Sequence, residues 1–288
     1  MAALAFAKDA RVEIVRINAN RGVGGAMKLG IARALALGAT FIVKVDADGQ
    51  MDARYIPNML RVLDVNPKIA FVKGNRFIDG SIARVMPTQR LIGNSAMTLL
   101  VRMATGYWNS VDPTNGFFAI RASALNRVDL QKLANRYYFE ISLLGALGLR
   151  RAEIAEMEMP AIYGDVPSSL SIVRTMLTFP LRLIATFLKR VMWQYFIADM
   201  NVGSLLLVLG LLLLTFAGTV GSIWWAQALR SGIPTTAGTA TIVIAPLIMG
   251  SQLLLNALLY DVQFSSRVFK IASEDLNVRS SAYLTVNA

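Results

Sequence analysis

Apolar and polar positions along the first 165 residues predict strands and helices in alternation. Three short apolar runs have the length and composition of buried strands, at 12–17, 40–45 and 69–74. Two segments carry apolar residues at helical spacing, 24–38 and 55–65, and Gly38 is placed to end the first. Alternating strands and helices are typical of a parallel sheet with covering helices. We therefore expect an α/β domain over residues 1–165.

Two later stretches are long, apolar and free of charge. Val202 to Ala226 covers about 25 residues, which at 1.5 Å per residue spans a hydrocarbon core of roughly 30 Å. Ser231 to Tyr260 is also long enough to cross, even where its start is loop. We expect a transmembrane domain of two helices over 201–262. A buried helical hairpin in a soluble domain is the alternative.

Residues 166–200 have the pattern of amphipathic helices. Apolar residues recur at helical spacing there, while Arg182 and Lys189 lie on another side and Pro180 divides the segment in two. We expect two helices lying in the membrane interface, with their basic residues toward lipid headgroups. Core-facing helices of the soluble part are the alternative. Residues 263–288 would then be a cytoplasmic tail.

Basic residues gather beside the predicted spans. The chain has 29 Lys and Arg against 18 Asp and Glu, a formal charge of +11. Only Arg230 lies between the spans, whereas several basic residues flank them, Arg182, Lys189, Arg190, Arg267 and Lys270. The positive-inside rule then predicts that the α/β domain and both termini lie on the cytoplasmic side of the inner (plasma) membrane. This distribution indicates an anionic lipid bilayer as the partner and argues against nucleic acid.

The chain contains no Cys and no His. A disulfide framework, a thiolate nucleophile and a histidine general base are therefore excluded for these 288 residues. Any catalysis must use carboxylates, amides, hydroxyls, Arg or Lys, or a bound metal.

The stretch "KVDADGQMD" from Lys44 to Asp52 ends a predicted strand on two carboxylates. Residues two apart in extended chain point the same way, so Asp46 and Asp48 can share one cation, and Gln50 adds an amide oxygen. Mg²⁺ or Mn²⁺ usually keeps sites for water and substrate phosphates, which implies a diphosphate substrate. A calcium loop would need further oxygen ligands that "DADGQMDARYIP" lacks. A surface turn is the alternative interpretation.

Five motifs occur in an order that resembles a known family: "NANRGVGGAMKLG", "VKVDADGQMD", "KGNRF", "DPTNGFFAI" and "NRYYFE". With the interfacial helices and two spans, they resemble the family 2, GT-A fold glycosyltransferases of the polyprenyl-phosphate, dolichol-phosphate mannose synthase-like branch. The resemblance implies a metal-dependent hexosyltransferase with a GT-A-like, mostly parallel sheet. It also implies a nucleotide-sugar donor, of the GDP-mannose or UDP-glucose type, and a polyprenyl-phosphate acceptor.

The same resemblance implies roles for individual residues. Asp46, Asp48 and Gln50 would surround Mg²⁺ or Mn²⁺ and the donor diphosphate. Asn20 and Gly22 belong to the Gly-rich motif and would contact substrate. Two phosphate clamps are expected, with Arg76 in the first and Arg90 and Arg174 as further candidates. Asp112 and Gly116 would shape the acceptor side.

A lipid phosphate acceptor explains why histidine is not needed. The second ionisation of a phosphate monoester lies near pH 6, so the acceptor is already ionised near neutral pH. The enzyme must instead hold two anionic groups together while the leaving diphosphate gains charge, a task for metal and guanidinium groups. Glu140 of "YYFE" falls where hydroxyl-acceptor members carry their base, and a helix-start or ion-pair role is the alternative.

Departures from the family pattern produce further expectations. The family begins with "P-x-Y-N-E" and "D-D-x-S" elements on its first strands, and neither occurs here. We expect the first strands to be missing, so that the sheet has an open edge. The processive signature "Q-x-x-R-W" is also lacking, which favours transfer of a single sugar. The alternative is a truncated, catalytically inactive membrane protein that binds lipid phosphate. A homo-oligomer is compatible with either.

Overall fold

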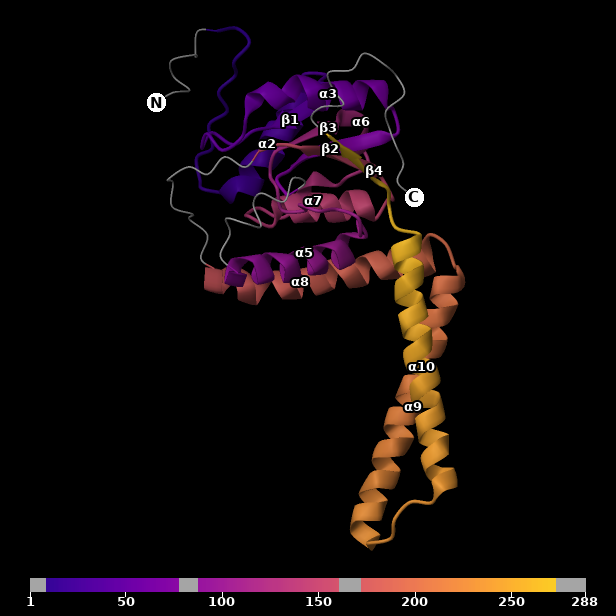
Figure 1. Cartoon of the computed structure of the whole chain (residues 1–288). Coiled ribbons are helices and arrows are strands. Elements are labelled where there is room, and N and C mark those ends of the chain that lie inside the picture. The colour runs from indigo at the N-terminus through magenta and orange to yellow at the C-terminus, as the bar shows by residue number, and fades with distance from the viewer. Residues whose placement is uncertain (1–8, 78–87, 161–171, 273–288) are drawn as a thin grey trace. The chain divides into compact units, whose positions relative to one another are not determined.

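The computed structural model describes residues 9–77, 88–160 and 172–272. These residues belong to two compact units (Figure 1). The first unit takes in the chain up to Thr186 and returns from Ser266, and the second runs from Phe187 to Ser265. The predicted α/β domain is the main part of the first unit, and the predicted spans lie in the second.

The sheet of the first unit has five strands, β1 Phe41–Lys44, β2 Ile69–Asn75, β3 Phe118–Arg121, β4 Glu153–Glu158 and β5 Val268–Ile271. Their order is β1-β3-β2-β4-β5. β3 runs antiparallel to both of its neighbours, whereas β2, β4 and β5 are parallel to one another. The α/β class is confirmed, and the sheet is mixed rather than mostly parallel because β3 enters between β1 and β2 in the reverse direction.

Helices cover both faces of this sheet (Figure 1). The helices of the first unit are α2 Gly22–Ala36, α3 Ile56–Val65, α5 Thr88–Thr105, α6 Ala122–Leu125, α7 Phe139–Gly148 and the start of α8 Ile172–Met192. Side chains on a strand alternate between faces. Phe71 and Phe118 therefore pack toward α2 and α7, while Val72 and Ala119 pack toward α3. The core thus lies on both sides of the strands.

Four of the predicted elements are confirmed. The helix expected at 24–38 is α2, and Gly38 follows it with a φ of +77°, a conformation that favours glycine. The strands expected at 40–45 and 69–74 are β1 and β2, and the helix expected at 55–65 is α3.

The strand predicted at 12–17 is wrong. These residues have no regular structure, and Val12, Ile14 and Val15 are 40%, 37% and 44% exposed. An apolar run becomes a strand only where a neighbouring strand supplies hydrogen bonds and a covering layer. Among the described residues the run has no such neighbour.

Three strands were not predicted. β3 and β4 contain four and six residues, too few for a clear periodicity. β5 lies within the segment expected to be a cytoplasmic tail, and it pairs in parallel with β4 through Val268 to Ile271. Part of that segment therefore completes the sheet.

The second unit contains a helical hairpin, α9 Val202–Ser231 and α10 Ala237–Gln263. Both helices are long and apolar enough to cross a membrane, by length and composition. Their backbones approach closely at Gly210 and Gly250, where a Cβ on Gly210 would lie 3.2 Å from the Gly250 carbonyl oxygen. Small residues at such a crossing allow two helices to pack without side chains between them.

The amphipathic segment is one helix rather than two. α8 runs through Pro180 and continues into a π-helical turn, Trp193–Ile197. Proline removes one backbone donor, and twelve further residues of helix follow it up to Met192, so this single loss does not end the helix. Leu181, Ile184 and Leu188 of α8 are exposed, whereas Leu183 is buried, as expected of an amphipathic helix.

Candidate functional site

The strand-end carboxylates lie beside a buried lysine. Lys44 is the last residue of β1, and its side chain is 2% exposed. Its Nζ lies 2.6 Å from Asp46 Oδ2 and 3.3 Å from Glu140 Oε1. Glu140 belongs to the first turn of α7, so β1 and α7 together hold one ammonium between two carboxylates. A buried lysine needs such partners, because an unpaired buried charge is costly.

Gly116, in the loop that precedes β3, lies against these three side chains. A Cβ at Gly116 would lie 2.6 Å from Lys44 Nζ, 3.5 Å from Glu140 Oε1 and 3.6 Å from Asp46 Oδ2. The first distance is shorter than a normal Cβ contact, so a side chain at residue 116 would require the Lys44 ammonium to shift from this position. The structure thereby brings together three residues that the sequence singled out, Asp46, Gly116 and Glu140.

Asp48 and Gln50 lie in the turn that follows. Asp48 Oδ1 accepts a hydrogen bond of 3.0 Å from the Gln50 backbone N–H, and Gly49 between them has a φ of +74°. Asp46 is 39% exposed at its side chain, so this turn is open to solvent. Carboxylate and amide oxygens are donors that suit Mg²⁺ or Mn²⁺. Within the described residues no group of three His, Cys, Asp or Glu could hold a metal ion by itself. The role of Asp46, Asp48 and Gln50 as ligands of a divalent cation therefore stays a prediction.

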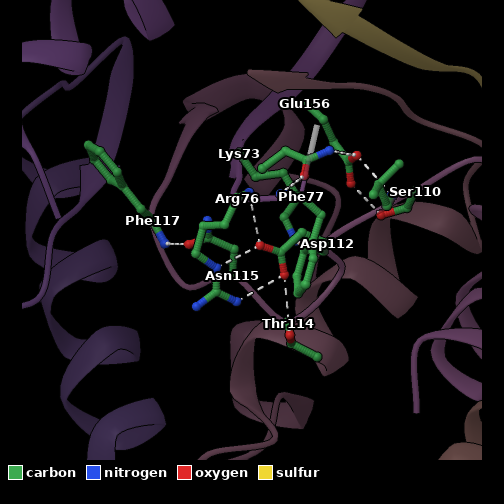
Figure 2. Close-up of polar contacts among 11 residues, drawn as sticks. Lys73, Arg76, Phe77, Ser110, Asp112, Thr114, Asn115, Phe117 and Glu156 are labelled. Atoms are coloured by element: carbon green, nitrogen blue, oxygen red, sulfur yellow. Dashed lines mark hydrogen bonds and ion pairs between the residues drawn. The ribbon is translucent and has the colours of Figure 1, made fainter. Parts of the chain in front are cut away.

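Arg76 and Asp112 form a bidentate ion pair at the end of β2 (Figure 2). Arg76 Nε donates to Asp112 Oδ2 at 2.7 Å, and Nη2 donates to Oδ1 at 3.0 Å. Asp112 is fully buried, while the Arg76 side chain is 38% exposed. Asp112 is therefore placed to position the Arg76 guanidinium, while the Arg76 side chain as a whole stays partly exposed.

A buried polar network adjoins this pair (Figure 2). Lys73 Nζ donates to the Asp112 carbonyl oxygen, and Glu156 accepts from Asn75 Nδ2, Ser110 Oγ and the Val111 N–H. Burial lowers the pKa of Lys73, and the Asp112 and Glu156 carboxylates oppose that shift. β2 and β4 thus hold the 110–116 loop through charged hydrogen bonds.

Asn20 and Gly22 lie at a separate place, the start of α2. Asn20 Oδ1 accepts from the Gly22 N–H at 2.9 Å, and Gly22 has a φ of +73°. A Cβ there would lie 2.6 Å from the Asn135 carbonyl oxygen, so glycine is required for space as well as conformation. Both residues line a cavity of about 410 Å³ with Arg21, Arg136 and Tyr137 among its other walls.

Two predicted phosphate ligands cannot be placed. Arg90 lies in α5 and Arg174 lies in α8, but both side chains fall outside the described residues. Their role as clamps stays a prediction.

Sequence reasoning missed Lys44, Lys73 and Glu156. Lys44 stands next to the carboxylate motif, and Lys73 interrupts the apolar run of β2, so a lysine inside a buried strand was the available signal. Glu156 gave a similar signal in "EIAEME", which the sequence did not reveal as a strand.

The chain was compared with known protein families and proteins. Residues 2–129 match the family model for Glycosyl transferase family 2. The chain is 29% identical over 155 residues to UDP-N-acetylglucosamine--dolichyl-phosphate N-acetylglucosaminyltransferase of Methanococcus voltae, covering 54% of this chain and 61% of that protein. It is 28% identical over 141 residues to polyprenol monophosphomannose synthase of Mycolicibacterium smegmatis, covering 49% and 52%. It is 30% identical over 152 residues to undecaprenyl-phosphate mannosyltransferase of Micrococcus luteus, covering 51% and 61%.

The matched regions amount to 52% to 61% of the length of these three relatives. Among solved structures, glucosyl-3-phosphoglycerate synthase from Mycobacterium tuberculosis aligns with a TM-score of 0.41 and 20% sequence identity, covering 63% of this chain and 57% of that chain.

Proposed function

We propose that the chain transfers a single hexose from a nucleotide sugar to a polyprenyl phosphate, because residues 2–129 match the family model for Glycosyl transferase family 2. The donor is of the GDP-mannose or UDP-glucose type. The proposal draws support from three relatives whose names describe sugar transfer to a dolichyl or polyprenyl carrier. The observation that carries it is the site at the end of β1, where Asp46 lies close to Glu140 and Gly116 around Lys44 and Asp48 follows in the adjoining turn.

The membrane helices supply the place for a lipid acceptor. α9 and α10 are long and apolar enough to span a bilayer, and α8 presents an exposed apolar stripe that includes Leu181, Ile184 and Leu188. A polyprenyl chain is soluble only in such a bilayer, so its phosphate is presented at the headgroup level. We place the domain on the cytoplasmic side, where the nucleotide sugar is available.

Asp46, Asp48 and Gln50 would hold a divalent cation in this reaction. The bound cation supplies charge neutralisation for the leaving diphosphate. Arg76 presents a guanidinium that Asp112 fixes in place, and its exposed part can donate to phosphate oxygens. Both contributions act where negative charge increases along the reaction, which is where preorganised electrostatics are most effective.

Glu140 then serves as an ion-pair partner rather than a general base. Its Oε1 lies 3.3 Å from Lys44 Nζ, which supports the ion-pair role. The acceptor phosphate already carries negative charge near neutral pH, so its attacking oxygen has no proton to lose.

The proposal is tested by sugar transfer in membranes that contain the full chain. Labelled nucleotide sugar is incubated with polyprenyl phosphate, and lipid-linked label is extracted into organic solvent and counted. Transfer should occur with Mg²⁺ or Mn²⁺ and stop in EDTA. Asp48→Asn should lower the rate roughly 100-fold to 1000-fold, because it removes one key contact from a preorganised site. Glu140→Gln should cost much less.

Asp64→Asn is the matched control, because Asp64 is an exposed aspartate on α3. Its rate should equal that of the unchanged chain. Full transfer in EDTA or in Asp48→Asn would refute the metal-diphosphate role of this site. Binding of polyprenyl phosphate without transfer would instead favour a lipid-phosphate-binding protein.

A further inference from the structure

We propose that Lys44 is a positioning residue of this site, a built-in cation that neutralises the Asp46 and Glu140 carboxylates and thereby weakens the binding of a bare divalent metal. The proposal rests on the transferase function above. It adds a residue that neither the sequence motifs nor the family resemblance singled out.

The geometry makes Lys44 the common partner of both carboxylates. Its Nζ lies 2.6 Å from Asp46 Oδ2 and 3.3 Å from Glu140 Oε1, and the side chain is 2% exposed. Gly116 lies against the ammonium on another side, at a distance that leaves no room for a Cβ. The lysine is therefore confined to one position by three separate segments, β1, α7 and the loop before β3.

The accessibility of the carboxylates separates this group from an ordinary core ion pair. The Asp46 side chain is 39% exposed and that of Glu140 is 15% exposed, so ions from solvent can reach them. Glu156, by contrast, is fully buried and accepts three hydrogen bonds within the protein. The positive charge of Lys44 therefore lies next to carboxylates that cations from solvent can reach, and it repels those cations.

The net charge of Lys44, Asp46 and Glu140 determines how strongly this group attracts a bare divalent cation. Lys44, Asp46 and Glu140 together carry one net negative charge when ionised. Without the ammonium, the two carboxylates would carry two negative charges side by side, which is a better site for a bare cation. Lys44 therefore favours a cation that arrives with phosphate oxygens of its own, because Asp46 Oδ2 and Glu140 Oε1 are already engaged.

Mn²⁺ binding in the absence of any sugar nucleotide tests this proposal. The full chain is purified in detergent micelles and titrated with Mn²⁺ alone, and free Mn²⁺ is followed by electron paramagnetic resonance. Lys44→Met should bind Mn²⁺ on the order of tenfold more tightly than the unchanged chain, because a nearby positive charge has been removed. Glu140→Gln should bind it more weakly, because a negative charge has been removed.

The double variant Lys44→Met/Glu140→Gln restores the net charge and should return Mn²⁺ affinity to within about threefold of the unchanged chain, because the two charge changes cancel. Lys68→Met is the control, since Lys68 is an exposed lysine in the turn before β2. It should leave the affinity unchanged.

Equal Mn²⁺ affinity in Lys44→Met and the unchanged chain, with equal melting temperatures, would overturn the proposal. If Lys44→Met does not fold, Glu140→Gln decides the matter, and unchanged affinity in that variant overturns the proposal as well. Failure of sugar transfer with the predicted order of Mn²⁺ affinities intact would reject the transferase function alone.

Discussion

At the scale of single residues, the ion pair with Asp112 fixes the orientation of the Arg76 guanidinium. Two parallel hydrogen bonds of 2.7 and 3.0 Å fix the plane of the fork, and Asp112 has no exposed surface of its own. Lysine carries the same charge but lacks that planar fork. The orientation of the donors, as much as their charge, is therefore the property that this pair would contribute to the proposed phosphate binding.

Arg76→Lys should lower sugar transfer at least tenfold, because one point charge cannot satisfy Asp112 and two phosphate oxygens in the same geometry. The measurement is the initial rate of lipid-linked label in membranes. Arg33→Lys is the control, since Arg33, in the last turn of α2, forms an exposed pair with Glu13. Equal rates for Arg76→Lys and the control would contradict the fork-dependent role.

At the scale of elements, a second bidentate pair joins the end of α8 to the end of α10 within the second unit. Arg190 Nη1 and Nη2 donate to Asp261 Oδ1 and Oδ2 at 2.7 and 2.8 Å, and Tyr195 adds a hydroxyl donor at 2.8 Å. The Arg190 side chain is 2% exposed. Arg190 is therefore neutralised inside the protein and adds nothing to the basic surface beside the membrane, although the sequence suggested that it did.

Arg190→Met should destabilise the second unit by roughly 3 to 5 kcal/mol, because it leaves the Asp261 carboxylate buried without its partner. Tryptophan fluorescence during thermal unfolding in detergent micelles would measure the loss. Lys189→Met, one residue earlier and exposed, should change stability by less than about 0.5 kcal/mol. Similar melting of the two variants would show that the ion pair does not stabilise this unit.

At the scale of the whole molecule, the remaining basic residues on both flanks of the hairpin predict its orientation. Lys189 precedes α9 and Lys270 follows α10, whereas Arg230 is the one basic residue of the described segment between Asn201 and Phe264. By the positive-inside rule we expect the turn after α9 to face outward. We then expect the α/β domain and both termini to face the cytoplasm.

Single cysteines test this orientation without background, because the chain has none of its own. Ser231→Cys lies at the end of α9 and should react with an impermeant thiol reagent in intact cells. Lys68→Cys lies in an exposed turn of the domain and should react only after permeabilisation. Labelling of Lys68→Cys in intact cells would reverse the orientation.

The sequence by itself determined the elements whose signal is local. α2 and α3 follow from helical periodicity over ten or more residues, and β1 and β2 from apolar runs with clear boundaries. The two spans follow from long apolar stretches without charge. The carboxylate motif could also be recognised from the sequence, because Asp46 and Asp48 lie two residues apart directly after a strand. Each of these features needs only neighbouring residues to be recognised.

Tertiary structure decided the features that depend on distant partners. A segment forms a strand only if another strand lies beside it. Residues 268–271 pair with β4 and form a strand, whereas residues 12–17 do not. The same holds for the site. Lys44 is held by Glu140 and lies against Gly116, and these two residues come 96 (140 − 44) and 72 (116 − 44) positions later in the chain. Periodicity cannot report such a meeting, because the free energy that stabilises a buried ammonium comes from carboxylates which only the folded chain brings within contact.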